Sequence, residues 1–241
     1  MNLFYIPDIP DDQTASLSPE ESRHCIKVLR MKAGETVHFT DGKGYLYRGS
    51  IVEDSPKRCL LQIMEKRFIP FGKPSLHLAI APTKNLNRTE WFLEKATEIG
   101  VARITPLYCT HSERRTIKPE RLEKVLISAM KQSLKTSLPE LMPAMTFNNF
   151  VKSATEQHRF FAYCGEGEKK LLQKVCPQGE AVLIMIGPEG GFAPQEVATA
   201  QEHGFIPVSL GASRLRTETA GIVACHTFNL LNENQQYTLQ S

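Results

Sequence analysis

The 241-residue sequence contains no long apolar run, no closely paired cysteines and neither of the two commonest nucleotide-binding loops. A membrane-spanning helix needs about 20 consecutive apolar residues, so we expect no membrane partner. The six cysteines are scattered without a C-x-x-C pair, which argues against a metal site or a disulfide framework and predicts reduced thiols in a cytoplasmic protein. The first residues lack a basic segment followed by an apolar run, and therefore predict no secretory signal.

The charge of the chain is nearly balanced, because 29 basic and 26 acidic side chains leave a formal net charge of +3. So small an excess does not by itself indicate a nucleic-acid partner. Its distribution is uneven, since residues 103–135 carry eight lysines and arginines but only three glutamates. A local positive excess of this kind can attract a polyanion, although an ordinary solvated helix face is an equally good interpretation.

Residues 1–70 have the pattern of a small β-rich domain with one helix. Ser18-Pro19-Glu20-Glu21 is a capping box with proline at the first helical position. Short β-type runs follow at 36–40, 45–52 and 59–64, and Asp41-Gly42 supplies a hairpin turn between the first two. Strands of this length with tight turns predict a small barrel. The segment 69–74, rich in proline and glycine, predicts a linker after it.

From residue 74 to 241 the pattern changes to strands that alternate with helices, which predicts a parallel sheet covered on both faces. Ala181–Ile186 is a continuous apolar run, typical of a strand that is buried on both faces. A second capping box, Asn87–Glu90, predicts a helix that ends at Gly100. The other expected strands are 76–81, 103–107, 159–163 and 206–210, and the other expected helices are 119–135, 194–204 and 217–232.

Two turns that follow expected strands form the candidate ligand site. The strand Ala181–Ile186 runs directly into Gly187-Pro188-Glu189-Gly190-Gly191, where three glycines permit close backbone approach to a ligand. Neither G-x-x-x-x-G-K-[ST] nor G-x-G-x-x-G is present, which disfavours the phosphate-loop and Rossmann folds. Taken alone, this turn is also compatible with an ordinary strand-to-helix connection.

The second turn, residues 210–221, places Arg214, Arg216, Thr217 and Glu218 where a helix is expected to begin. Thr217 is the expected cap of that helix, and Glu218 suits its first turn. Two arginines at a helix amino terminus oppose the helix dipole, which indicates a role other than stability. The alternative is plain capping with both arginines in solvent.

Five sequence blocks follow one another along the chain. They are His24–Arg30 (H-C-I-K-V-L-R), Glu94–Gly100, Ser112–Arg114, Ile186–Phe192, and Leu210-Gly211 with Leu215–Ala220. Together they resemble the RsmE family, the 16S ribosomal RNA uracil-N3 methyltransferases of the SPOUT superfamily. One segment departs from the family pattern E-x-x-E-Q-S-x-R: here Gln132-Ser133 remain, Lys131 replaces an acid, and Lys135 lies near the position of the missing arginine. Lysine lacks the bidentate geometry of arginine, so the departure bears on RNA contact and not on the reaction class.

The resemblance implies an α/β fold in which a PUA-like RNA-binding β-barrel at 1–70 precedes a knotted SPOUT methyltransferase domain at 74–241. It implies S-adenosylmethionine as cofactor, no metal, and a homodimer. The substrate would be N3 of one uridine in the decoding region of 16S rRNA, within the assembled small ribosomal subunit. The residues expected to hold the cofactor are Ala81, Pro82, Thr83, Ile186, Gly187, Pro188, Glu189, Gly190, Gly191, Leu210, Gly211, Leu215, Arg216, Thr217, Thr219 and Ala220.

The chemistry implied by the resemblance needs uracil N3 to lose its proton, at least partly, in the transition state. Arg216 is the first candidate to stabilise the developing anion, and Arg214 the second. Glu218 is a candidate general base and equally a candidate to orient Arg216. Water is a further candidate base. The residues expected to contact RNA are Arg23, His24, Lys27, Arg30, Arg114, Arg115, Lys118 and Lys135. Two alternatives stay open: a ribose 2′-O-methyltransferase of the same fold, and a non-enzymatic RNA-binding protein.

Overall fold

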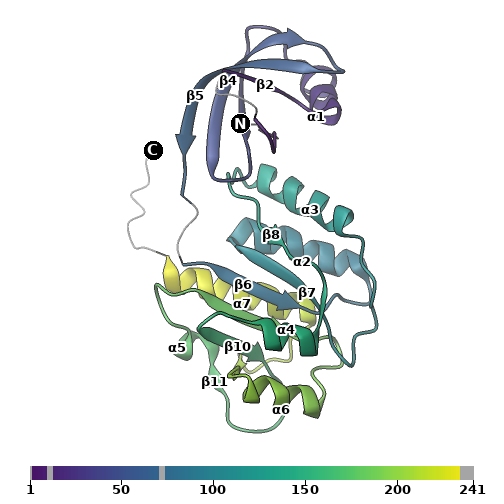
Figure 1. Cartoon of the computed structure of the whole chain (residues 1–241), viewed down its shortest axis with the longest axis vertical. Coiled ribbons are helices and arrows are strands. Elements are labelled where there is room, and N and C mark those ends of the chain that lie inside the picture. The colour runs from purple at the N-terminus through teal and green to yellow at the C-terminus, as the bar shows by residue number, and fades with distance from the viewer. Residues whose placement is uncertain (1, 10–12, 71–73, 234–241) are drawn as a thin grey trace. The chain divides into compact units, whose positions relative to one another are not determined.

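The computed structural model describes residues 2–9, 13–70 and 74–233, which divide into two compact units (Figure 1). The first unit contains the described residues up to 70 together with a later segment, Leu126–Leu138. The second unit contains residues 74–125 and 139–233. The chain therefore leaves the first unit after the expected linker, returns to it once, and leaves it again.

The described strands of the first unit form one five-stranded sheet in the order β1-β3-β4-β5-β2. β4 and β5 are ten residues each and pair as a long antiparallel ribbon. The predicted Asp41-Gly42 turn joins β3 to β4, because Asp41 Oδ1 accepts a hydrogen bond from the backbone N–H of Lys43 at 2.8 Å. The bounds are β1 Leu3–Tyr5, β2 Thr14–Ser16, β3 Thr36–Thr40, β4 Tyr45–Asp54 and β5 Cys59–Phe68.

The helix of the first unit begins as predicted and is five residues long. Ser18 Oγ accepts a hydrogen bond from the backbone N–H of Glu21, and α1 spans Pro19–Arg23. The chain then widens into a π-helical turn, η1, at His24–Val28. Arg30 lies beyond it with a positive φ of 59°. Three of the residues expected to contact RNA, Arg23, Lys27 and Arg30, therefore do not share one regular α-helix, because the wider turn departs from 3.6 residues per turn.

The segment Leu126–Leu138 is tied to the β3–β4 hairpin by its backbone. The carbonyl of Thr136 accepts from the backbone N–H of Gly44 and from Thr40 Oγ1, each at 3.0 Å. The N–H of Leu138 donates to the carbonyl of Gly42 at 2.8 Å. These bonds satisfy polar groups at the closed end of the hairpin, and they explain why a segment so late in the sequence belongs to the first unit.

The described strands of the second unit form a parallel sheet in the order β11-β13-β10-β12-β6-β7-β8, with β9 paired to β7. This confirms the predicted α/β class. β12, the expected apolar strand, is central and fully buried. The strands are β6 Leu76–Ile80, β7 Arg103–Tyr108, β8 Glu140–Leu141, β9 Met145–Thr146, β10 His158–Ala162, β11 Lys170–Leu171, β12 Val182–Ile186 and β13 Ile206–Ser209.

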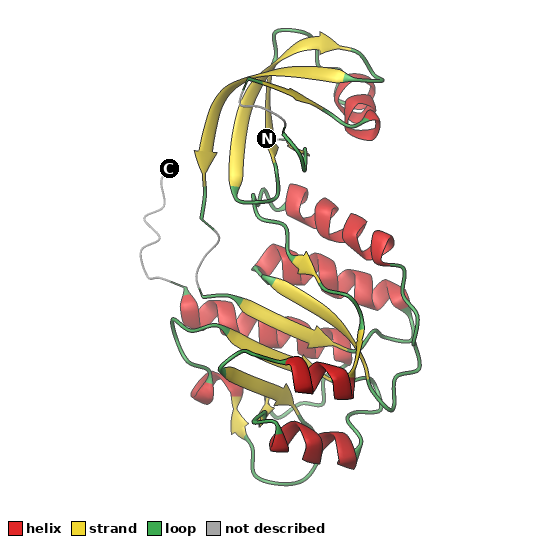
Figure 2. Cartoon of the chain, viewed as in Figure 1, coloured by secondary structure: helices red, strands yellow, loops and turns green. Residues whose placement is uncertain are grey.

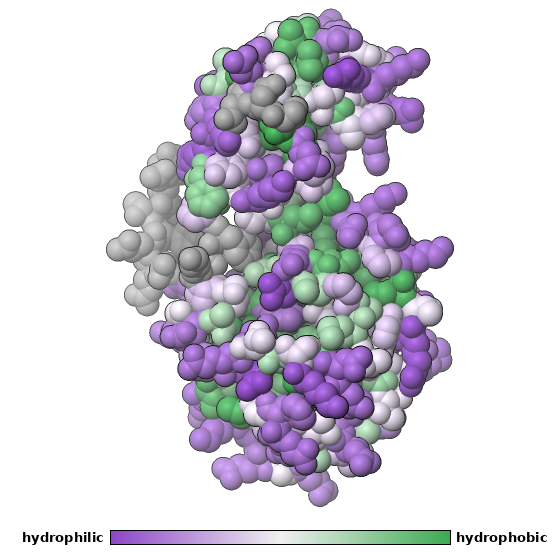
Figure 3. Space-filling model, in the orientation of Figure 1, coloured by the Kyte–Doolittle hydropathy of each residue, from purple (hydrophilic) through white to green (hydrophobic). Residues whose placement is uncertain are grey.

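Helices cover both faces of this sheet, with α4 and α6 in front of it and α2 and α7 behind it in Figure 2. A β-carbon on Gly221 of α7 would lie 2.6 Å from the ring of Phe92 on α2, so glycine allows the close approach of these two helices. The surface over α4 and α6 is mainly hydrophilic (Figure 3). The helices are α2 Leu86–Ile99, α3 Pro119–Gln132, α4 Phe147–Ser153, α5 Leu172–Val175, α6 Pro194–Glu202 and α7 Thr217–Asn232.

One predicted helix start and one predicted helix cap in the second unit are wrong, the start by two residues and the cap by one. α2 begins at Leu86, and Asn85 caps it by accepting from the N–H of Asn87 at 3.1 Å. Thr89, which lies inside the predicted box but is neither of its two capping residues, accepts from the N–H of Thr83 at 3.0 Å. α7 is capped at Arg216 and not at Thr217. In the part of the chain that the structure describes, no helix has the length and apolar content needed to cross a membrane.

Candidate functional site

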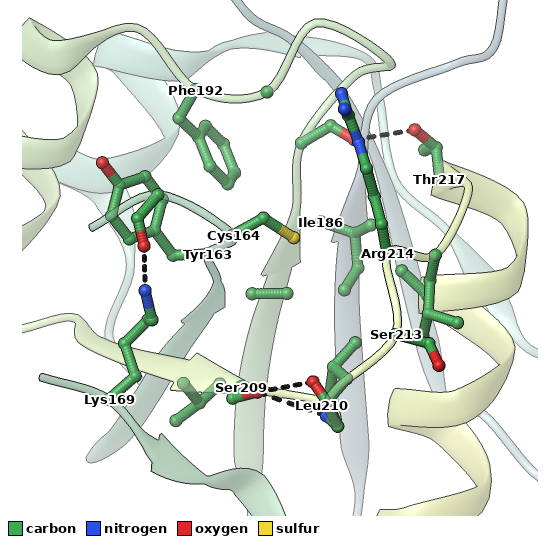
Figure 4. Close-up of a pocket in the computed structure, with 18 of the residues that line it drawn as sticks. Tyr163, Cys164, Lys169, Ile186, Phe192, Ser209, Leu210, Ser213, Arg214 and Thr217 are labelled. Atoms are coloured by element: carbon green, nitrogen blue, oxygen red, sulfur yellow. Dashed lines mark hydrogen bonds between the residues drawn. The ribbon is translucent and has the colours of Figure 1, made fainter. Parts of the chain in front are cut away.

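A cavity of about 640 Å³ opens at the carboxyl ends of the adjacent strands β13, β10 and β12 (Figure 4). This is the edge where open parallel sheets hold their ligands. Both predicted turns contribute to its wall. The lining residues are Ala162, Tyr163, Cys164, Gly165, Lys169, Ile186, Gly187, Pro188, Glu189, Gly190, Gly191, Phe192, Val208, Ser209, Leu210, Gly211, Ala212, Ser213, Arg214, Leu215, Thr217 and Ala220.

The turn after β12 has a backbone that needs glycine. The N–H of Gly191 donates to the carbonyl of Pro188 at 2.8 Å, and Gly191 has a φ of 73°, in the left-handed region. Gly190 lies against the loop that follows β7, since a β-carbon there would sit 3.0 Å from that of His111. The turn is therefore held in a fixed shape with its backbone exposed to the cavity.

The turn after β13 is joined to the first turn by Thr217, at the beginning of α7. Thr217 Oγ1 donates to the carbonyl of Gly187 at 3.1 Å (Figure 4). Ser209 Oγ both donates to the carbonyl of Gly211 and accepts from its N–H. Thr217 thus fastens two segments about 30 residues apart, a role that its position as a supposed cap did not predict.

A third wall comes from the loop after β10, which contains no recognisable sequence motif. Tyr163, Cys164 and Lys169 face the cavity in Figure 4. Lys169 donates to the carbonyl of Gly165, and its ammonium lies 5.2 Å from the centre of the Tyr163 ring. The available signal was topological: β10 pairs with both β12 and β13, so its carboxyl end had to meet both turns.

Glu196 on α6 connects the loop after β7 to the loop after β12. Its carboxylate accepts from the N–H of Thr110 and from the N–H of Ala193, each at 2.8 Å. Glu196 is buried, so both bonds are shielded from water. The sequence did not single out this glutamate, because only the folded sheet brings residues 110 and 193 to one carboxylate.

The expected cofactor residues after β6 lie behind the cavity wall. Ala81, Pro82 and Thr83 are buried and are not among the lining residues. Ala81 supports the wall, since its N–H donates to the carbonyl of Ile186 at 3.0 Å. Arg216 and Thr219 also lie outside the lining, whereas the other expected cofactor residues are in it.

The three expected catalytic side chains point in different directions. Arg214 is exposed and lines the cavity (Figure 4). Arg216 is exposed at the cap of α7. The side chain of Glu218 is only 9% exposed, and its Oε1 lies 3.8 Å from Nε of Arg88 on α2. Among the described residues, no group forms a hydrogen bond with Glu218 Oε2.

The expected RNA-contacting side chains fall into two groups. Arg23, His24, Lys27 and Arg30 are exposed in the first unit, where Lys135 is half-buried. In the second unit Lys118 is exposed, whereas two arginines are partly engaged by backbone carbonyls.

Those two are the arginines of the loop after β7. Arg114 donates to the carbonyl of Lys84 at 2.8 Å, and Arg115 to that of Thr110 at 3.1 Å. Glu189, in the turn after β12, accepts from the N–H of Lys84, in the loop after β6, at 3.0 Å. Arg114 thereby links the loops after β6 and β7, and a change at Arg114 would affect their shape as well as the local charge.

One of the titratable groups in the cavity lining is a thiol, the exposed side chain of Cys164. Within the described ranges, no group of three or more His, Cys, Asp or Glu side chains is placed to hold a metal ion. All six cysteines are free thiols, and five of them are buried. Burial raises the pKa of the Cys109 thiol above its ordinary value, so this cysteine stays protonated at neutral pH. The site is a ligand cavity framed by backbone turns and bordered by arginines.

Two family models match consecutive parts of the chain. The model described as RNA methyltransferase domain matches residues 72–229, and the model described as RNA methyltransferase PUA domain matches residues 17–64. The first contains the cavity with all its lining residues. The second contains most of the sheet of the first unit.

Whole relatives are similar along nearly their full length. The ribosomal RNA small subunit methyltransferase E of Buchnera aphidicola is 30% identical over 92% of this chain and 90% of its own. A crystal structure from Porphyromonas gingivalis, described as a probable rRNA-methyltransferase, is 41% identical with a TM-score of 0.90 and covers 96% of this chain and 98% of its own. The ribosomal RNA small subunit methyltransferase E of Neisseria gonorrhoeae, solved with bound S-adenosyl methionine, is 27% identical with a TM-score of 0.84 and respective coverages of 96% and 98%.

Proposed function

Because the chain belongs to the RsmE family of RNA methyltransferases, we propose that it methylates N3 of one uridine in the decoding region of 16S rRNA. The coarser activity follows from family membership: the protein is an S-adenosylmethionine-dependent ribosomal RNA methyltransferase with a PUA-like domain. The observation that supports the proposal most directly is the cavity between the turns after β12 and β13.

The cavity suits S-adenosylmethionine in size and in chemistry. Its volume of about 640 Å³ lies within the usual range for ligand pockets. Ile186, Val208 and Leu210 offer apolar contact for an adenine ring, and the two glycine-containing turns offer backbone polar groups. We propose that the lining residues of these turns hold the cofactor, with Ala81, Pro82 and Thr83 supporting them from behind. When bound, the cofactor supplies a methyl group on an electron-poor sulfonium.

Arg216 and Arg214 have the charge that the target base requires. Uracil N3 is a poor nucleophile while it carries a proton, so negative charge must develop on the base before the methyl group is transferred. A fixed guanidinium near the base stabilises that charge. We assign this role to Arg216 first and to Arg214 second. The exposure of both side chains leaves them accessible to a base that enters from solvent.

For Glu218 we favour a positioning role over that of general base. Its carboxylate faces Arg88 and is not part of the cavity lining. A buried carboxylate at the first turn of α7 interacts favourably with the helix dipole and keeps the helix cap, Arg216, in place two residues earlier. Water then takes the N3 proton.

The RNA is proposed to contact both units. In this proposal residues 1–70 form the RNA-binding domain and residues 74–241 the catalytic domain, which carries the knot that the resemblance implies. We further propose a homodimer, because Trp91 on α2 and Leu230 on α7 are large apolar side chains left exposed on two helices that pack together. The assembled small subunit is the proposed substrate.

The test is mass spectrometry of nucleosides from small subunits incubated with the pure protein and S-adenosylmethionine. The subunits come from a strain that lacks this enzyme, so that the target is unmodified. We expect 3-methyluridine to appear with at most one methyl group per subunit. A 2′-O-methylated nucleoside would identify the alternative ribose chemistry, and no methylated product despite measured RNA binding would indicate a non-enzymatic protein.

A further inference from the structure

The open end of the β4–β5 ribbon carries an aromatic and basic surface that the catalytic cavity does not use. Tyr45 pairs with Phe68, and Tyr47 pairs with Lys66, in the antiparallel register. Residues opposite one another in such a ladder project from the same face. Tyr45, Lys66 and Phe68 therefore form one patch over the buried ring of Tyr47, and we call it the ribbon patch.

Phe68 is the unusual member of the ribbon patch. Its side chain is 56% exposed, although a phenylalanine at a strand end normally gains free energy by burial. Its ring centre lies 5.0 Å from that of Tyr45 at an interplanar angle of 54°. The N–H of Ile69 donates to the carbonyl of Gly44 at 2.8 Å, which fixes the backbone beside the ring. The exposed ring is thus held on an ordered strand.

The ribbon patch is also basic. The ammonium of Lys66 lies 4.9 Å from the centre of the Tyr45 ring and 5.8 Å from that of Tyr47. Arg67, the neighbour of Lys66 in the chain, is also exposed and projects from the opposite face, where Arg48 is paired with Glu65 at 3.0 Å. The ribbon end therefore presents an exposed cation on each face beside the exposed ring. Exposed cations at an aromatic surface favour a polyanionic partner.

We propose that the ribbon patch binds an unpaired segment of the RNA substrate, with one base stacked on Phe68. Every base offers a π-face, and a surface that combines aromatic rings with cations is how proteins hold single strands without reading their sequence. Lys66, on the same face as Phe68, is placed to neutralise an adjoining phosphate. This inference rests on the proposed RNA substrate, and it adds a contact outside both the cavity and the basic residues near η1.

The test uses the full chain and a short single-stranded RNA with no internal pairing, measured by fluorescence anisotropy across a salt series. Phe68→Ala should weaken binding roughly five- to hundredfold, the usual range for one stacked base. Its slope of log affinity against log salt should equal that of the wild type, because no charge is removed. Lys66→Ala should instead lower the slope by about 0.7. Phe68→Trp should restore affinity.

Met64→Ala is the matched control. Met64 lies on the same strand and is also 56% exposed, but it has no aromatic ring. It sits at the register shift between Arg48 and Gly49, where it has no partner in the pairing, and its replacement should leave RNA affinity unchanged. Thermal unfolding of each variant checks that the substitutions at these exposed positions do not alter the fold.

Three results would overturn the proposal that the ribbon patch binds RNA. They are equal losses for Phe68→Ala and Met64→Ala, no recovery with Phe68→Trp, and no binding of single-stranded RNA by the wild type. Failure of the proposed function gives a different result, because a wild type that methylates no ribosomal RNA forms no 3-methyluridine in the nucleoside experiment, whatever the RNA affinity of Phe68→Ala. Conversely, normal methylation by the wild type together with an unchanged RNA affinity of Phe68→Ala refutes only the ribbon patch.

Discussion

Gly191 tests whether the turn after β12 shapes the cofactor site. Its φ of 73° is a conformation that L-residues adopt at a cost of about 1–2 kcal/mol. Gly191→Ala should therefore weaken S-adenosylmethionine binding, because relief of this strain moves the turn. Gly179→Ala is the control, since Gly179 has a φ of 79°, has open space around it and lies outside the lining. Calorimetric titration should show lower affinity only for Gly191→Ala, and equal affinities would place the turn outside the binding site.

Arg216 tests the assignment of the stabilising cation. Because its charge matters mainly once the base becomes negative, Arg216→Ala should lower single-turnover methylation on the order of 10²–10³-fold. Cofactor affinity should barely change, since Arg216 is not in the lining. Arg214→Ala, which alters the lining, should affect both quantities. If Arg216→Ala keeps its rate and Arg214→Ala loses it, the two arginines exchange roles.

Single residues show how far the sequence could identify the site. The glycines and Thr217 were identified correctly as members of the two turns, since motif and strand position both pointed to them. The bond from Thr217 to Gly187 and the wall formed by Tyr163 and Lys169 were not predictable. They depend on which strands become neighbours, and local spacing carries no information on that.

At the scale of elements, Glu196 is the contact that holds two loops at the cavity edge. Glu196→Gln replaces one acceptor oxygen with a donor that faces a backbone N–H, which should destabilise the second unit by about 1–3 kcal/mol. The affinity for S-adenosylmethionine should fall with it, because the turn after β12 loses its anchor at Ala193. Glu202→Gln, on the exposed side of the same helix, should change neither. Urea unfolding and titration measure the two effects, and a fully stable Glu196→Gln would show that the loops do not need this anchor.

The longer elements could be predicted because their own residues determine them. α7 spans Thr217–Asn232 as expected, and the apolar run at 181–186 forms the central β12. The sequence did not predict β1, β2, β8, β9 or β11, which have two or three residues each. Segments this short have no periodicity, and they become strands only because a neighbouring strand offers hydrogen bonds.

At the scale of the whole second unit, the sheet differs between the carboxyl ends and the amino ends of its strands. The cavity lies at the carboxyl edge, whereas the opposite edge carries His77, whose ring nitrogens lie 2.6 Å from Glu156 Oε1 and 2.8 Å from Thr105 Oγ1. The hydrogen bond from His77 lowers the pKa of Glu156. Such a carboxylate stabilises the fold above its ordinary pKa, and the stabilisation is lost as pH falls through the lowered value.

Glu156→Gln should therefore unfold more easily at neutral pH, by about 1–3 kcal/mol, and the difference from wild type should shrink below about pH 4. Glu140→Gln removes an exposed ion pair with Arg103 and should cost less than about 1 kcal/mol. Urea titrations at several pH values give both numbers. A Glu156 effect that is independent of pH would show that shape, and not charge, stabilises this edge.

The late segment Leu126–Leu138 has a consequence for folding during translation. Thr40 Oγ1 and the carbonyl of Thr136 are 96 residues apart in sequence, so the hairpin of the first unit stays unfinished while the intervening chain is made. At roughly 5–20 residues per second, the amino-terminal sheet waits on the order of 5–20 seconds for its last hydrogen bonds. During translation, the first unit therefore matures only after the first part of the second unit, up to residue 125, has been made.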